Sequence, residues 1–328
     1  MPASAGTEHA ATNAILFDRD RIEHLEMLAD RPRKLSGSTL LWVDVHQGAL
    51  IDADEVAEAF DLDKKTRKYL EMPNKKPVFD DHGRYIHITT YAPREDDHGD
   101  LHAVECVVGE NWVITAHDRP IAVLDDFATR VSGSGDTGSL DGPSFLAALL
   151  EWVLGSYTAA FERIEQRLED FDVHAMRGEG AEDDIERLVE MRKEVGMLRR
   201  ALAAHRSALV ALTHPELEAL GDNASGERFR SLFARFESTL QEARDAREAI
   251  VGSFDVLIAR GGHHTNQIMK ILTLTSVILL PGTLIAGLMG MNFRVELFSY
   301  TWLFWVVLAT IFAIATLALG FAKYRDWI

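Results

Sequence analysis

The segment ILTLTSVILLPGTLIAGLMGMNF, residues 271–293, contains no Asp, Glu, Lys or Arg. A second uncharged segment, residues 297–322, follows three residues later. The two segments have 23 and 26 residues, and about 20 helical residues cross the roughly 30 Å hydrocarbon core of a bilayer. We therefore predict two membrane-spanning helices, at about 270–291 and 301–322. Two buried core helices are the alternative, but adjacent runs of this length argue against them.

The basic residues that flank the two predicted spans indicate their orientation. Lys270 precedes the first span, and Lys323 and Arg325 follow the second, whereas the connecting loop offers only Arg294 beside Glu296. Basic flanks tend to stay on the cytoplasmic side. Since the first 20 residues also lack the pattern of a secretory signal, we expect a multi-pass protein of the cell (inner) membrane, with both termini in the cytoplasm.

The charge of the chain is concentrated in its first 264 residues. Residues 265–328 sum to +2, so residues 1–264 carry −17 minus 2, or −19. An acidic surface of this kind argues against a nucleic-acid partner and attracts cations. The single cysteine, Cys106, cannot form a disulfide within the chain.

Short β-rich segments with turns between them characterise residues 1–143. They include residues 38–45, 84–91, 103–108 and 111–116, with a helical patch at 53–60. Enrichment in Val, Ile, Thr and aromatic residues is typical of strands. We predict an α+β cytoplasmic domain over residues 1–143.

From residue 144 onward the apolar residues follow the period of an α-helix. We predict breaks at Thr213-His214, which precede Pro215, and at residues 221–226. Beyond them one very long helix should run from about Phe229 into the first span. Residues 144–264 therefore form a helical and stalk region, and residues 265–328 form a transmembrane pore domain. A long amphipathic stalk needs lateral partners, so we expect an oligomer.

A stripe of residues at helical spacing runs along the first span and the turn before it. Its members mix small, hydroxyl and bulky apolar side chains: Asn266, Met269, Leu272, Ser276, Leu280, Thr283, Gly287 and Gly290. Such a mixture suits a pore wall with hydrophobic constrictions that exclude water. Ordinary helix packing through small residues explains the spacing equally well.

The first span ends in Gly290-Met291-Asn292. In this position, between two terminal spans and after a long helix, the tripeptide resembles the signature of the CorA magnesium transporter family. The resemblance extends to residues 265–270 and to Leu280-Pro281, and more loosely to residues 42–44, 77–85 and 113–117.

The resemblance implies a CorA-like homopentamer whose first span lines a pore. Gly290, Met291 and Asn292 would form a selectivity filter, with Met269, Leu272 and Leu280 as hydrophobic gate layers. Magnesium sheds its water reluctantly and prefers oxygen, so a ring of Asn292 amides would hold the hydrated ion through its waters. Glu296 is a further possible metal contact. The metal ion is cargo, and we expect no cofactor.

Several alternatives remain open at this point. His263 and His264 lie near the expected cytoplasmic entrance. They point about 100° apart on a helix, although rings from five subunits could bind a transition metal. A zinc transporter resembling the ZntB branch is therefore the second interpretation, and cobalt or nickel are also compatible. A membrane-anchored scaffold protein is the rival from another class. We expect no enzyme, because the sequence contains no catalytic constellation.

Overall fold

The computed structural model describes thirteen segments of the chain. By its internal contacts the chain divides into two compact units, Met1–Ser253 and Phe254–Ile328. The described residues are 13–18, 21–25, 28, 35, 39–46, 53–72, 76–94, 101–118, 121–133, 141–177, 183–214, 223–291 and 301–325.

The first unit is built on a seven-stranded mixed sheet with the order β2-β1-β3-β7-β6-β5-β4. β3 and β7 pair in parallel, with Trp42 opposite Val113, and the other neighbours are antiparallel. The strands are β1 (Asn13–Asp18), β2 (Arg21–Leu25), β3 (Thr39–His46), β4 (Phe79–Asp81), β5 (Ile86–Pro93), β6 (Leu101–Val108) and β7 (Trp112–His117).

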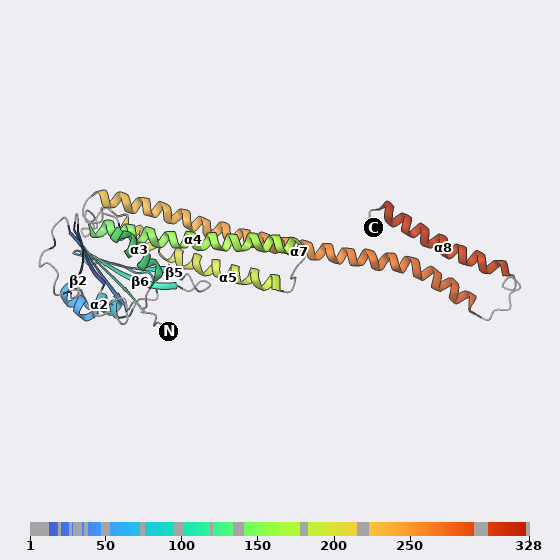
Figure 1. Ribbon diagram of the computed structural model, residues 1–328, viewed down its shortest axis with the longest axis horizontal. Coiled ribbons are helices and arrows are strands. Elements are labelled where there is room, and N and C mark those ends of the chain that lie inside the picture. The colour runs from blue at the N-terminus through green and yellow to red at the C-terminus, as the bar shows by residue number, and fades with distance from the viewer. Residues whose placement is uncertain are drawn as a thin grey trace, which may run out of the picture. The chain divides into compact units, whose positions relative to one another are not determined.

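Helices cover both faces of this sheet because successive strand residues point to opposite sides. On one face Leu41, Val43 and Val45 join a core with Val56 of α1 (Ala53–Ala59) and Leu70 of α2 (Lys64–Glu71). On the other face the Trp42 ring lies 5.9 Å from Phe127 of α3 (Ala122–Gly133) and 5.4 Å from Phe145 of α4 (Gly142–Arg177). Figure 1 shows the α2 and α4 layers on opposite sides of the sheet.

The helical layer continues with α5 (Asp183–Ala204), α6 (Arg206–Leu212) and the first part of α7 (Asn223–Met289). Figure 1 shows α4, α5 and this part of α7 running side by side. Within it Phe229, Phe236 and Ile250 are at most 1% exposed. The packed side of α7 therefore belongs to the core of the first unit.

The second unit consists of the rest of α7 and of α8 (Thr301–Tyr324). Both helices are long and apolar enough to cross a membrane, and the most apolar window of each has no buried residue. α4 also passes this test of length and composition, but 61% of its window is buried. Gly261 and Gly262 do not interrupt α7.

The strands predicted from the sequence correspond to β3, β5, β6 and β7, and the predicted helical patch corresponds to α1. Three details of the prediction were wrong or incomplete. β2 and β4 were missed because they are short, with five and three residues, and β1 because only four of its residues are apolar. The helical period passes through His205, yet the helix breaks there between α5 and α6. Of the predicted break at residues 221–226, residues 223–226 belong to α7, and residues 221 and 222 lie outside the described residues.

Candidate functional site

The stripe predicted from the spacing lies along one continuous helix. α7 carries its members from Asn266 to Gly287, and Gly290 follows directly after the last helical residue, Met289. Steps of three and four residues place side chains on the same side of a helix. α7 therefore gives these residues a common face, which we call the stripe face.

The bulky apolar residues of the stripe face are not covered by their own chain. Met269, Leu272 and Leu280 are 53%, 57% and 67% exposed in the single chain. α8 approaches α7 on another side, because a Cβ atom on Gly282 would lie 3.5 Å from Cγ2 of Ile311. Gly282 lies about 200° from Leu280 around the helix axis. The hairpin of α7 and α8 thus leaves the stripe face available to other copies of the chain.

The hydroxyl groups of the stripe face already use their protons within α7. Ser276 Oγ donates to the carbonyl of Leu272 and Thr283 Oγ1 to that of Leu279, both at 2.8 Å. A hydroxyl group that donates in this way keeps its oxygen lone pairs for other donors. These oxygens can therefore accept hydrogen bonds from water, including water bound to a cation.

The C-terminal end of α7 closes in a tight turn. The Gly290 amide donates to the carbonyl of Ala286 at 2.9 Å, and the Met291 amide donates to that of Leu288 at 3.3 Å. A Cβ atom on residue 290 would lie 3.3 Å from the Ala286 oxygen, so a larger residue would crowd this turn. Asn292 and Glu296, the remaining predicted metal contacts, lie outside the described residues.

His263 and His264 are both exposed on α7. Neighbouring residues of a helix point about 100° apart. Among the described residues, no group of three or more His, Cys, Asp or Glu side chains is arranged to hold a metal ion. A transition-metal site at these histidines would therefore need side chains from several copies of the chain.

Sequence reasoning missed the buried polar groups of the seven-stranded sheet. Asp44 of β3 accepts hydrogen bonds from Thr115 Oγ1 and His117 Nε2 of β7, and Thr115 Oγ1 also accepts one from Trp42 Nε1. The only available signal was a polar residue within an apolar strand. Beside them, burial raises the pKa of the Cys106 thiol well above its usual range, with a smaller contribution from Glu105. This thiol is therefore poorly suited to metal binding or nucleophilic chemistry.

Comparison with known proteins agrees with this architecture. The sequence model of the family described as "CorA-like Mg2+ transporter protein" matches residues 37–323. The cobalt/magnesium transport protein CorA of Thermotoga maritima is 21% identical over 301 residues, which cover 89% of this chain and 84% of that protein.

Two solved structures share the fold. The complete structure of the CorA magnesium transporter from Methanocaldococcus jannaschii superposes with a TM-score of 0.78 at 20% identity, covering 96% of this chain and 98% of that one. The ZntB cytoplasmic domain from Vibrio parahaemolyticus superposes with a TM-score of 0.60 at 12% identity, covering 76% of this chain and 98% of that domain.

The family model and the complete CorA structure extend over the sheet, the helical layer and both apolar helices of the second unit. They confirm the predicted family and the CorA-like fold with two C-terminal membrane helices. Because the family model covers most of the sequence, the chain belongs to the CorA-like Mg2+ transporter family and is a divalent-cation transporter of the membrane.

Proposed function

We propose that the chain assembles as a homopentameric channel that carries hydrated Mg2+ across the cell membrane through a pore lined by α7. The observation that supports this most strongly is the uncovered stripe face. Met269, Leu272 and Leu280 are more than half exposed, while α8 packs on another side of α7. A ring of identical helices would turn the stripe faces toward a common axis and leave α8 toward the lipid.

The apolar layers of this ring would form the gate. In a symmetric assembly each of Met269, Leu272 and Leu280 becomes a layer of identical side chains around the axis. A narrow apolar neck excludes water, and a divalent cation that keeps its hydration shell cannot pass a dry constriction. Between the layers, the oxygens of Ser276 and Thr283 offer the acceptors that a hydrated ion needs.

Selection of the ion would take place at the outer end of α7. Five Asn292 amides would contact the water shell of the ion, with Gly290 and Met291 shaping the turn that presents them. Glu296 would add negative charge near the entrance. Contacts through water are weak enough for the ion to leave again, as conduction requires.

The orientation follows from the basic residues at the ends of the two helices. Lys270, Lys323 and Arg325 flank the apolar segments on the side that we assign to the cytoplasm. Both termini and the acidic sheet domain would then lie in the cytoplasm, with residues 292–300 on the outside.

Zinc is the second candidate cargo. The similarity to the ZntB cytoplasmic domain favours it, since the ZntB branch of the family is associated with zinc. His263 and His264 are exposed near the proposed cytoplasmic entrance, and imidazole rings from several subunits suit zinc better than magnesium.

Metal uptake by proteoliposomes that contain the purified chain tests this proposal. We expect saturable Mg2+ uptake that exceeds Zn2+ uptake, and its loss in Asn292→Ala without a change in oligomer size. Thr310→Val on α8 is the matched control, because its hydroxyl only donates to the carbonyl of Val306 within α8. Normal Mg2+ uptake in Asn292→Ala would remove this residue from the mechanism. Uptake of Zn2+ alone would favour the second cargo, and uptake of neither ion would favour a scaffold role.

A further inference from the structure

Three cations lie in one layer at the end of the hairpin that α7 and α8 form. The register of this hairpin follows from Gly282, where a Cβ atom would lie 3.5 Å from Cγ2 of Ile311. Lys270 precedes Gly282 by twelve residues, and Lys323 follows Ile311 by twelve residues. Because the helices are antiparallel, both cations lie about 18 Å from the contact toward the same end, at about 1.5 Å per residue. Arg325 lies about 3 Å beyond Lys323.

Two of these cations point to the same side of the hairpin. Each residue turns its side chain by about 100° around the helix axis, in the same sense for two antiparallel helices that are followed toward one end. Measured from the line that runs from α7 to α8, Lys270 then points at about 120° and Arg325 at about 140°. Lys323 points at about 300°, on the opposite side.

The surroundings of neighbouring side chains agree with these directions. The same construction turns Ala322 to about 200°, toward α7, and Ala322 is 1% exposed. It turns Phe321 to about 100°, beside Arg325, and Cζ of Arg325 lies 5.8 Å from the centroid of the Phe321 ring. Lys270 is partly covered, whereas residues 261–269 are all exposed. α8 therefore keeps its orientation to α7 up to this end of the hairpin.

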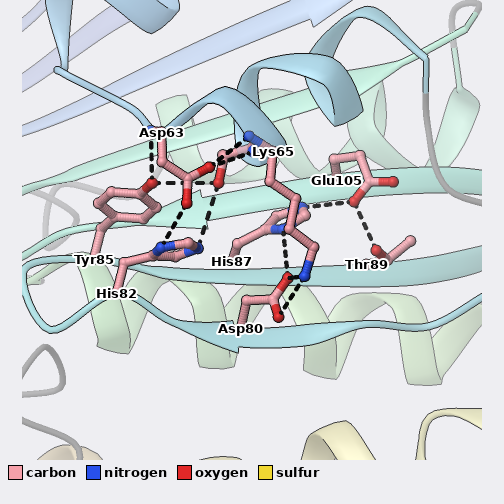
Figure 2. A network of polar contacts seen from close by, with 9 residues as sticks. Asp63, Lys65, Asp80, His82, Tyr85, His87, Thr89 and Glu105 are labelled. Atoms are coloured by element: carbon pink, nitrogen blue, oxygen red, sulfur yellow. Dashed lines mark hydrogen bonds and ion pairs between the residues drawn. The ribbon is translucent and has the colours of Figure 1, made fainter.

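Several cations of the first unit have carboxylate partners in their own chain. Figure 2 shows the polar network around α2, where Lys65 Nζ contacts the two carboxylate oxygens of Asp80 at 2.9 and 2.7 Å. In the same network His87 Nε2 lies 2.8 Å from Oε2 of Glu105. Within the described part of the chain, no carboxylate pairs in this way with any of the three cations at the end of the hairpin.

The sequence also offers few carboxylates to this end of the chain. Residues 256–328 contain five Lys and Arg residues but only two carboxylates, Glu296 and Asp326. Glu296 belongs to the connection at the other end of the hairpin. Asp326 follows Arg325 directly and lies outside the described residues. The layer therefore keeps an excess of positive charge, which an anion from outside the chain can neutralise.

The layer of cations lies where the apolar part of the hairpin ends. The uncharged segment 271–293 begins directly after Lys270, and the uncharged segment 297–322 ends directly before Lys323. Because these helices belong to a membrane transporter, the layer lies at the level of the lipid headgroups. Phe321 is 56% exposed and lies one turn closer to the hydrocarbon than Arg325. Cations beside an exposed apolar ring fit a ligand that carries both a phosphate and an acyl chain.

We propose that Lys270, Arg325 and the ring of Phe321 form a binding site for the phosphate and one acyl chain of an anionic phospholipid. Lys270 Nζ and the guanidinium of Arg325 donate hydrogen bonds to the phosphate oxygens, and Arg presents two N–H groups at once. Lys270 lies about 200° around α7 from Leu272, so the site faces away from the proposed pore. The site requires that α7 and α8 lie in a membrane, and it does not depend on the passage of ions.

Native mass spectrometry of the full-length protein, freed of lipid in detergent, measures the affinity for each added phospholipid. We expect phosphatidylglycerol to bind at least roughly fivefold more tightly than phosphatidylcholine with the same acyl chains, because its headgroup is anionic. Lys270→Gln and Arg325→Gln should each weaken the binding of phosphatidylglycerol roughly fivefold. Equal affinities of the wild type for the two lipids would overturn the proposal.

Lys323→Gln is the matched control, because it removes one cation at the same depth but on the opposite side of the hairpin. It should leave the affinity for phosphatidylglycerol nearly unchanged. Equal losses in all three variants would show a general attraction to basic residues and would contradict the site. Inorganic phosphate in large excess should not displace phosphatidylglycerol, and displacement would identify a site for a free anion instead. If a Gln variant does not assemble, the comparison of the two lipids and of phosphate on the wild type still decides.

Discussion

α4 and the second half of α7 are both long, apolar helices, but their apolar residues are covered in different ways. The most apolar window of α4 is 61% buried within the chain, while the corresponding windows of α7 and α8 are 0% buried. α4 finds its cover in the sheet and in neighbouring helices, where Phe145 is 0% exposed. The membrane helices find no such cover within the described part of the chain, and we propose that lipid and other copies supply it. Apolar composition alone therefore does not determine where a helix belongs.

Among single substitutions, we expect the largest effect on stability in α4, whose apolar residues are buried within the chain. The Phe145 ring lies 5.4 Å from Trp42 and 5.3 Å from Phe127, so Phe145→Ala should lower the free energy of unfolding by about 3–5 kcal/mol. Denaturant unfolding in detergent, followed by tryptophan fluorescence, measures this loss. Phe312→Ala on α8, where the ring is 66% exposed, should leave the unfolding transition of the first unit unchanged. Equal losses in both variants would contradict the division between the two regions.

The next largest effect should be on the pH dependence of the stability of the first unit, through His205. The Tyr91 amide donates to Nε2 of His205 at 2.8 Å, and Nδ1 lies 3.3 Å from the carbonyl of Leu202. Burial lowers the pKa of His205 from 6.5 to about 4, although hydrogen bonds to Leu202 and Ala201 oppose the shift. The unfolded chain therefore binds a proton first as the pH falls.

The difference between the pKa of His205 in the unfolded chain and in the folded chain corresponds to about 3 kcal/mol of stability. This stability is fully present above pH 6.5 and is progressively lost as the pH falls from 6.5 to about 4. Unfolding free energies measured across that window should fall less steeply with acid in His205→Gln than in the wild type. The same slope in both proteins would show that His205 is not responsible.

We expect a smaller effect at the proposed gate, on the exposed stripe face of α7. Removing one Leu side chain from water stabilises it by about 1.5–3 kcal/mol. If the loss of this side chain lowers the free-energy barrier to ion passage by about 1.5 kcal/mol, the rate of passage rises roughly tenfold. Leu272→Ser should therefore raise Mg2+ flux into proteoliposomes about tenfold when internal Mg2+ is high and the channel is closed. Ile271→Ser is the control, since Ile271 is 67% exposed but points about 100° away from Leu272. Equal flux in the two variants would place the gate elsewhere.

The smallest effect concerns the exposed ion pair between α4 and α7. Arg235 Nη1 lies 3.1 Å from Oε1 of Glu151, and both side chains are about half exposed. Arg235→Ala should cost less than about 1 kcal/mol of unfolding free energy. Phe236→Ala, at a 0% exposed neighbour, should cost several times more in the same denaturant titration. If Arg235→Ala cost more unfolding free energy than Phe236→Ala, the ion pair rather than the apolar contacts would hold α7 to α4.

The membrane helices could be predicted from the sequence because a helix in lipid has one simple requirement, a long segment without charged residues. A helix in lipid tolerates few charges over about 20 residues, and residues 271–293 and 297–322 contain none. The strands β3, β5, β6 and β7 were also predictable from their β-branched residues. β1 was not, because Asn13–Asp18 offers only four apolar residues between polar ends.

The break at His205 had no signal in the hydrophobic period, since the apolar spacing continues across it. His205 makes a tertiary contact at this break, because its Nε2 accepts a hydrogen bond from the Tyr91 amide 114 residues earlier, and the spacing of apolar residues cannot reveal such a contact. The pair of His87 and Glu105 was hidden for the same reason, because two strands must be aligned before the side chains meet. The spacing of the stripe residues could be read directly, but the period of one helix does not specify what covers that face.

The central claim is that α7 is covered by identical copies around a pore, and the mass of the intact assembly tests it most directly. Native mass spectrometry in mild detergent should show a dominant species that contains five chains of 36.6 kDa. A single lining helix from each chain cannot enclose a channel when only one or two chains are present. A dominant monomer or dimer would therefore contradict the pore and leave the stripe face without its proposed cover.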